Sequence, residues 1–185
     1  DIKLYAPVIE NVFSHYDIPY YVDMRKKIYH YAPVRAVVLL MEISRGAYTI
    51  DDITELMKTG CVPISDDDVS MLENYAAEYG IKAYRFKRDF DFDPGGAYDL
   101  ERLNRARKIL IDFIDKFVSG NNSAATEGER IIHVSGFIKS NLKKIFSANI
   151  TMASQNGEYE RANAYIQIYN KLLDIMQGAY ELYKD

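Results

Sequence analysis

The sequence predicts a mainly α-helical protein, and three observations lead to that prediction. Apolar residues recur at helical spacing through most of the 185 residues. Thr49 and Ser65 each stand three positions before a carboxylate, a pattern that caps the start of a helix. Hydrophobic residues make up 48% of the chain, which is enough for a folded core. We expect only one or two short strands, near residues 18–22 and 81–88.

The opening segment predicts one helix and one extended run. Apolar spacing predicts a helix that ends near Asp17, and β-forming residues around Pro19 predict the strand at residues 18–22. A helix followed by a strand closes an α/β unit, and one such unit cannot make a sheet alone. The chain also lacks an initiator Met at Asp1. We therefore expect a segment of a longer protein that supplies the rest of the sheet.

From Pro33 onward the sequence predicts helices joined by short connections. They are expected from Pro33 to just before Gly46, and at about residues 50–59, 66–79, 98–118, 127–145 and over about 25 residues from Tyr159. Residues 81–93 lack a helical period and residues 120–125 are rich in loop formers, so both are predicted to interrupt the helices. On the helix at 98–118, the polar face is expected to hold Glu101, Arg102, Arg105, Arg107 and Lys108 in water.

Composition narrows the classes of function. A net charge of -4 disfavours a dedicated nucleic-acid-binding domain, because phosphate contacts need clustered Lys and Arg. The single Cys61 excludes an internal disulfide or a multi-cysteine metal site in this chain, and it fits a reducing cytoplasm. No apolar run approaches the length of a membrane span. We expect a soluble, cytoplasmic protein with no membrane partner.

Catalytic motifs are missing from the sequence. It contains no phosphate-binding loop, nucleophile elbow or zinc-protease helix, and its three histidines lie far apart. We therefore predict no catalytic, cofactor-binding or metal-binding residue here. Asp89, Asp91 and Asp93 alternate as in the first half of a calcium loop, which leaves a small metal-dependent hydrolase as a third hypothesis. Pro94 displaces the turn glycine of such a loop, so a solvated acidic loop is the preferred interpretation.

Basic residues suggest where DNA phosphates could bind. The candidates are two groups, Arg25, Lys26 and Lys27, and Lys139, Lys143 and Lys144. The alternative for each group is an ordinary charged surface. A further set, Arg85, Lys87 and Arg88 with Tyr84 and Phe86, has the mixture of charge and aromatics of a single-strand groove, although nearby acids oppose that interpretation.

Several short segments of the sequence, taken in order, resemble segments of known DNA-processing proteins. The first group comprises residues 5–10 (Tyr-Ala-Pro-Val-Ile-Glu), 17–23 (Asp-Ile-Pro-Tyr-Tyr-Val-Asp) and 30–35 (His-Tyr-Ala-Pro-Val-Arg). It resembles the stretch of superfamily 1 helicase-like proteins where the second RecA-like domain gives way to its inserted accessory subdomain. The second group, residues 53–60, 72–81 and 162–173, resembles the B subunit of bacterial ATP-dependent helicase/nuclease, the AddB or RexB family.

The resemblance implies a division of the chain and a function for its parent. Residues 1–31 are expected to be a helix–strand remnant of a RecA-like domain, and residues 32–185 a multi-helical accessory (2B-like) subdomain. The parent, with an A subunit, is expected to unwind and degrade double-strand break ends for recombinational repair, using ATP, magnesium and an iron–sulfur cluster. None of the corresponding catalytic or cofactor motifs has a matching position here.

The expected function of this chain is therefore that of a non-catalytic structural segment that contributes to the DNA channel. A second hypothesis, of another class, explains the acidic net charge equally well. In that alternative the chain is a stand-alone helical protein-interaction module without nucleic-acid function.

Overall fold

The computed structural model describes residues 2–19, 28–46 and 48–184, and in these ranges every regular element is a helix. The mainly α-helical fold class is thus confirmed. The α-helices are α1 (Ile2–His15), α2 (Ala32–Ser44), α3 (Ile50–Lys58), α4 (Asp66–Glu78), α5 (Leu100–Ser123), α6 (Glu127–Phe137), α7 (Lys143–Gln155) and α8 (Tyr159–Tyr183). Short 3-10 helices lie at η1 (Ile28–His30) and η2 (Ala83–Lys87), and a π-helical turn, η3 (Ile138–Leu142), joins α6 to α7.

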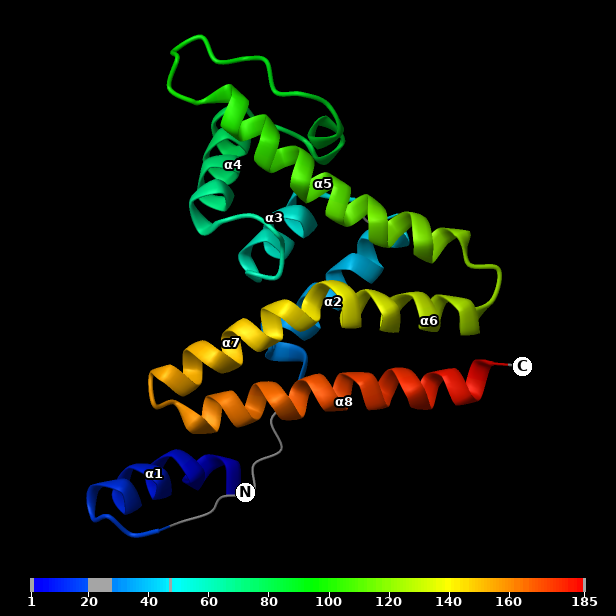
Figure 1. Ribbon diagram of the computed structural model, residues 1–185. Coiled ribbons are helices and arrows are strands. Elements are labelled where there is room, and N and C mark those ends of the chain that lie inside the picture. Colours follow the sequence, from blue (N-terminus) through cyan, green and yellow to red (C-terminus); the bar gives the residue numbers. More distant parts are fainter. Residues whose placement is uncertain (1, 20–27, 47, 185) are drawn as a thin grey trace.

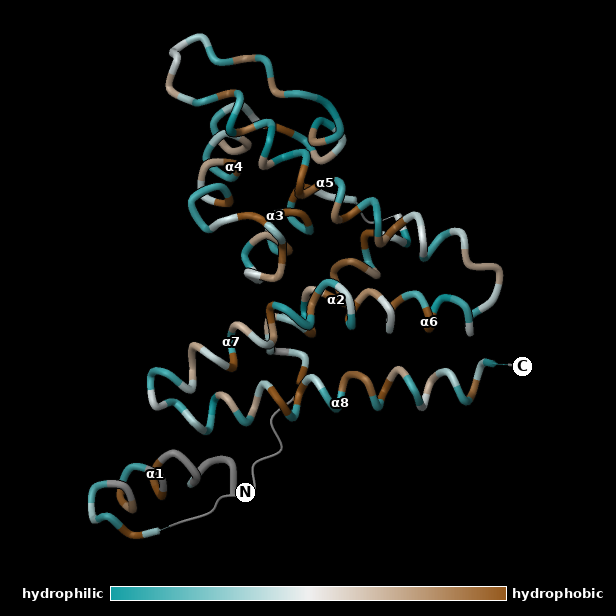
Figure 2. Tube along the Cα trace, in the orientation of Figure 1, coloured by the Kyte–Doolittle hydropathy of each residue, from teal (hydrophilic) through white to brown (hydrophobic). Residues whose placement is uncertain are grey.

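The long helix α5 connects two groups of helices. It packs against α4 and α2 of the first group and against α6 of the second. The α6–η3–α7 unit runs as one bent rod beside α8, as Figure 1 shows. Figure 2 shows that α2 is mostly hydrophobic along its length, in agreement with its many buried residues. One hydrophobic core therefore extends from α2 to α8.

The predicted starts and stops of α3 and α4 are confirmed. The hydroxyl of Thr49 accepts the backbone N–H of Asp52, and the Asp52 carboxylate in turn accepts the N–H of Thr49. At the start of α4, the Ser65 hydroxyl accepts the N–H of Asp68 and donates to the Asp68 carboxylate. Both helices end before a glycine with positive φ, at +65° for Gly60 and +59° for Gly80, a conformation that favours glycine.

The strand predicted at residues 81–88 is wrong, because this segment contains η2. The N–H of Arg85 donates to the carbonyl of Lys82, which closes a tight turn instead of a ladder bond. Phe86 is fully buried in the core. The aromatic side chain that favoured a strand here is instead buried in the core. The described part of the chain also contains no strand with which this segment could pair. Of the strand predicted at 18–22, residues 20–22 lie outside the described residues, and Ile18 and Pro19 have no regular structure.

The loop predicted at 120–125 is wrong for its first residues, since α5 continues through Ser123. Gly120 lies beneath the imidazole of His133 on α6, and a Cβ at this position would come within 2.1 Å of the ring. The side chain of Asn121 donates to Ser44 of α2 at 3.0 Å. Tertiary contacts thus stabilise a turn of helix that local composition disfavours.

The helix predicted at about 127–145 begins at Glu127 as expected, but the helical rod continues to Gln155 through η3. In η3 the Ser140 hydroxyl donates to the carbonyl of Gly136, and the Asn141 amide donates to that of Phe137. These side chains donate hydrogen bonds to backbone carbonyls of the preceding turn, next to the wider π-helical turn. The predicted helix of about 25 residues from Tyr159 is confirmed as α8.

Arg107, predicted to face water, is only 6% exposed, so that prediction is wrong. Its guanidinium donates to the carbonyl of Phe86 at 2.7 Å, to Asn104 at 3.1 Å, and to the carboxylate of Asp89. Burial of a charged side chain is tolerated when such partners satisfy its donors. Helical spacing alone does not show which segment packs over a helix. Here the segment around Phe86 packs over this face of α5 and covers Arg107.

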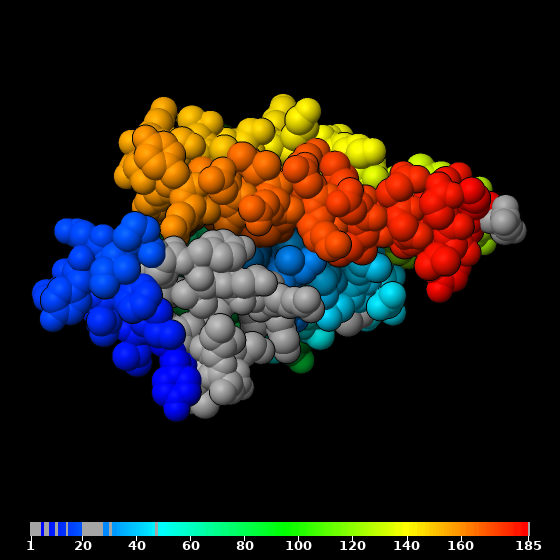
Figure 3. All heavy atoms as spheres, turned by 90° about the horizontal axis from the view of Figure 1, so that it is seen from below, coloured from blue at the N-terminus to red at the C-terminus, as the bar shows by residue number. Residues whose placement is uncertain are grey.

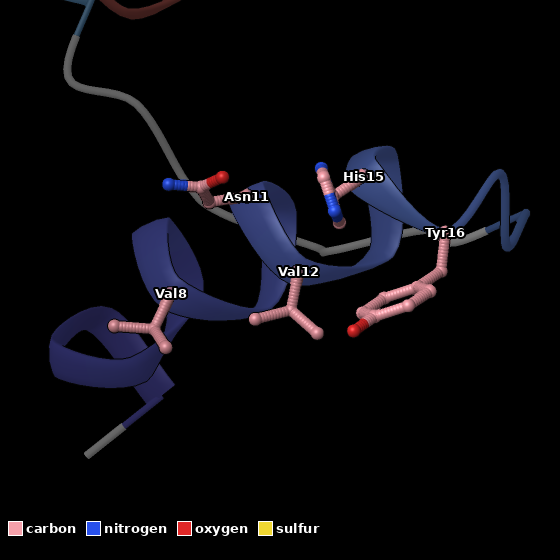
Figure 4. A pocket seen from close by; sticks show the side chains of 5 residues that line it. All are labelled: Val8, Asn11, Val12, His15 and Tyr16. Atoms are coloured by element: carbon pink, nitrogen blue, oxygen red, sulfur yellow. The ribbon is translucent and has the colours of Figure 1, made fainter.

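The helix α1 ends at His15, close to the predicted position, and Asp17 follows with a φ of +52°. Its apolar side chains Tyr5, Val8 and Val12, with Tyr16 just beyond its end, are 45–68% exposed. Figure 4 shows Val8, Val12 and Tyr16 on the same side of the helix, where they line a shallow hollow. Figure 3 shows α1 at one end of the molecule. This apolar stripe therefore stays largely exposed.

Candidate nucleic-acid interface

The lysines predicted to contact DNA lie together on the exposed side of the bent rod. Lys139 belongs to η3, and Lys143 and Lys144 begin α7. All three are exposed. Lys139 and Lys143 are four residues apart across the π-helical turn, so they project from neighbouring positions on the helix surface. We refer to Lys139, Lys143 and Lys144 as the α7 lysine group.

The α7 lysine group lies in a stretch of the sequence without acidic residues. Residues 130–157 contain no Asp or Glu, although the whole chain has more acids than bases. No salt bridge within the described ranges involves any of the three lysines. An unneutralised cluster of ammonium groups on a helix surface suits contacts with phosphate oxygens.

Lys116 of α5 extends this basic surface, and sequence reasoning missed it. Its ammonium donates to the side chain of Asn141 at 3.4 Å. Nothing in the local sequence indicates this contact, since the two residues are 25 positions apart. The acid-free stretch at 130–157, by contrast, is a sequence signal that distinguishes the α7 lysine group from an ordinary charged surface.

The other predicted basic group, Arg25, Lys26 and Lys27, lies outside the described residues. The two groups are therefore not brought together by the described part of the fold. Arg25, Lys26 and Lys27 stay a prediction from sequence.

The single-strand groove suggested near η2 does not assemble as expected. Arg85 pairs with Asp91, and Lys87 pairs with Asp115 while it lies over the ring of Tyr48. Phe86 is buried in the core and cannot stack on a base. Of the two aromatic side chains, Tyr84 keeps an exposed ring, at 64%. Phosphates would have to compete with the acids that already hold these cations.

The alternating carboxylates of Asp89, Asp91 and Asp93 each bind a different partner. Asp89 pairs with Arg107 and Asp91 with Arg85. Asp93 accepts the backbone N–H groups of Tyr98 and Ala97, and these bonds lower its pKa below the ordinary value. Within the described residues, no group of three or more His, Cys, Asp or Glu is arranged to hold a metal ion. This arrangement fits a folded loop rather than a calcium or magnesium site.

The residues present do not fit the iron–sulfur cluster implied for the parent. Cys61 is the single cysteine of the chain, and an iron–sulfur cluster requires several thiolates. Its thiol is buried, and that burial raises its pKa to about 11.

None of the described helices is both long enough and apolar enough to cross a membrane.

Comparison with known proteins relates the chain to one kind of DNA enzyme. No family model matches it. It is 25% identical over 194 residues to the B subunit of the ATP-dependent helicase/deoxyribonuclease of Thermoanaerobacter sp. (strain X514), in a match that covers 98% of this chain. The corresponding B subunits of Clostridium novyi (strain NT) and Alkaliphilus metalliredigens (strain QYMF) are each 24% identical, over 186 and 198 residues. The chain resembles one segment of these B subunits.

The resemblance that the sequence phrases indicated is thus confirmed, and it extends over nearly the whole chain. The chain spans only 17% of the length of the Thermoanaerobacter protein and 16% of that from Clostridium novyi. The matched segment is the helical unit described above together with α1.

Proposed function

We propose that this chain is a non-catalytic helical segment of a helicase/deoxyribonuclease that processes DNA double-strand breaks for recombinational repair. The observation that supports this most is the similarity to the B subunits over 98% of the chain. ATP hydrolysis and strand cleavage would then depend on other parts of the protein. A partner A subunit, recombination and a cytoplasmic location belong to the same proposal.

The same proposal assigns residues 1–31 to a RecA-like domain and residues 32–185 to an accessory subdomain. The exposed stripe Tyr5, Val8, Val12 and Tyr16 supports the first assignment. A helix that covers one face of a sheet needs such an apolar stripe. The core of α2 to α8 supports the second assignment, since none of the α1 side chains that the structure describes belongs to it.

Within the parent, we assign the α7 lysine group to contacts with the DNA backbone. The ammonium groups are exposed, form no salt bridge in the described ranges and lie in an acid-free stretch. Such contacts bind phosphates without reading the base sequence. The proposed role is to hold DNA along the outside of the α6–η3–α7 rod.

The test compares DNA binding by the 185-residue chain and by a triple variant, Lys139→Ala, Lys143→Ala and Lys144→Ala. Fluorescence anisotropy with a labelled duplex measures the binding constant at several salt concentrations. Each lost phosphate contact should reduce the slope of log K against log salt by about 0.9. We expect a reduction of about 2 or more, together with weaker binding.

A matched control removes the same charge elsewhere in the chain, through Lys82→Ala, Lys108→Ala and Lys171→Ala. All three side chains are exposed. The control should bind like the unmodified chain. Equal loss in both triple variants would show that only net charge matters, which contradicts a defined contact surface. A parallel variant with Arg25, Lys26 and Lys27 changed to Ala tests the group outside the described residues.

A further inference from the structure

A groove opens where the C-terminal turns of α2, α5 and α8 meet α6. Its volume is about 660 Å³. The floor is apolar and consists of Met41, Ile131, Val134, Met176 and Ala179. A concave site of this size with an apolar floor is typical of sites that take a small ligand or a few side chains of a peptide.

Close contacts fix the walls of this groove. The carbonyl of Tyr183 lies 2.9 Å from the point where a Cβ on Gly128 would stand, so the last turn of α8 packs directly on the start of α6. Among the other lining residues, Asn121 donates to Ser44 at 3.0 Å, and Ser44 donates to the carbonyl of Met41. The lining residues belong to four helices that contact one another, α2 with α5, α5 with α6 and α6 with α8, so the packing of the helices forms the groove.

The rim of the groove has a surplus of donors and positive charge. Arg45 is exposed, and no salt bridge in the described chain involves it. Arg130 pairs with Glu127, which is the single acid among the described lining residues. An occupant that complements this surface places an apolar group on the floor and a carboxylate beside Arg45.

We propose that this groove docks a short peptide segment of a partner protein, one that carries a large apolar side chain next to a carboxylate. The thioethers of Met41 and Met176 adapt their shape to such a side chain. Tyr183 and Arg45 at the rim are residue types that contribute strongly to protein interfaces. This docking function is independent of the DNA contacts assigned to the α7 lysine group.

The direct test uses the methionine methyl groups as reporters. The protein is labelled with ¹³C-methyl Met and titrated with an acetylated hexapeptide, Gly-Asp-Phe-Leu-Asp-Gly, while methyl spectra are recorded. We expect the signals of Met41 and Met176 to shift with a common binding curve. Met152 on α7 is 62% exposed and does not line the groove, so its signal should stay in place. Unmoved signals of Met41 and Met176 would refute the proposal.

Charge exchange tests the role of Arg45. A matched peptide with Asn in place of both Asp residues should bind about threefold more weakly. Arg45→Glu should bind the acidic peptide more weakly and prefer a peptide with Lys at those positions. The control Arg88→Glu makes the same charge change at an exposed arginine away from the groove and should leave binding unchanged. Equal affinity for the acidic and amide peptides would overturn the proposal, as would equal shifts with inorganic phosphate.

Discussion

Gly120 lies directly beneath the imidazole of His133, and this contact shows how one residue determines the spacing of two helices. Nε2 of His133 donates to the carbonyl of Phe117 at 2.9 Å. The ring also contacts Phe117 and Phe137, with centroids 5.4 and 6.4 Å away. The imidazole is therefore held in place on several sides. A side chain at position 120 has no room unless His133 moves.

We predict that Gly120→Ala destabilises the protein, although Ala is the better helix former. The propensity gain is about 1 kcal/mol, because Gly is costly inside a helix. Against it stand the displaced imidazole, its lost hydrogen bond and the overpacking of the α5–α6 contact. We expect a net loss of about 1–2 kcal/mol in the free energy of unfolding, measured by urea denaturation.

Gly178→Ala is the matched control, because this glycine lies inside α8 with no neighbouring atom within 4 Å of a new Cβ. It should raise stability by about 0.5–1 kcal/mol. Adding His133→Ala to Gly120→Ala should recover part of the loss through a favourable coupling of the two changes. Equal effects at positions 120 and 178 would show that helix propensity alone decides.

The segment between α4 and α5 folds as an element without α-helical or strand structure of its own. Its backbone is held by side chains from the flanking helices. Asn104 of α5 bonds both the N–H and the carbonyl of Phe90, at 2.7 and 2.8 Å. The Tyr75 hydroxyl donates to the carbonyl of Phe92 at 2.9 Å. Side-chain bonds thus replace the missing ladder and satisfy the buried backbone of this segment.

Arg107 supplies the buried part of this support, so its removal should loosen the whole segment. We predict that Arg107→Met lowers the free energy of unfolding by about 2–4 kcal/mol, because the carbonyl of Phe86 loses its charged donor in a buried site. Arg107→Lys should lose less, since it keeps a charge but not the planar fork. Thermal and urea unfolding measure both.

The nearby Arg105 provides the comparison for Arg107. It lies on the exposed side of α5 and forms a salt bridge with Glu101. Arg105→Ala should change stability by no more than about 0.5 kcal/mol. A similar small effect at position 107 would mean that the buried guanidinium is not what holds the segment.

The elements predicted correctly are those whose signals are local. The caps at Thr49 and Ser65 and the glycines after α3 and α4 act within one or two turns, so the sequence alone predicts both helices. The errors arise where a distant residue decides. His133 explains why α5 continues past Gly120, and the partners of Phe86 explain why residues 81–88 form no strand.

For the candidate nucleic-acid interface and the groove, too, the sequence predicts only what depends on residues close together along the chain. The α7 lysine group is visible in the sequence because its three members are close together along the chain. Lys116 and the groove residues are not, because they come from helices far apart in sequence that only the fold brings together. Arg45 in particular has no local feature that separates it from other exposed cations.

At the scale of the whole molecule, the hydrophobic core and the exposed apolar stripe of α1 lie in different parts of the described chain. The buried core comprises residues of α2 to α8 and the segments between them. In the described ranges, the principal helix–helix contacts also join these elements, and none of them involves α1. The apolar stripe of α1 is instead exposed. These observations support the proposed division into a helical body, residues 32–185, and an N-terminal piece that covers another surface.

Two deletions of equal length test this division. Removing residues 1–27 should change the free energy of unfolding by less than about 0.5 kcal/mol and should lower the binding of an apolar dye, because an exposed stripe is lost. Removing residues 159–185 eliminates α8, whose Ala162, Ile168 and Leu172 are buried against the body. At about 1.5–3 kcal/mol for each large buried side chain, this loss approaches the whole stability of a domain, so cooperative unfolding should disappear. A large destabilisation by the first deletion would instead place α1 within the cooperative core, and the division at residue 31 would have to move.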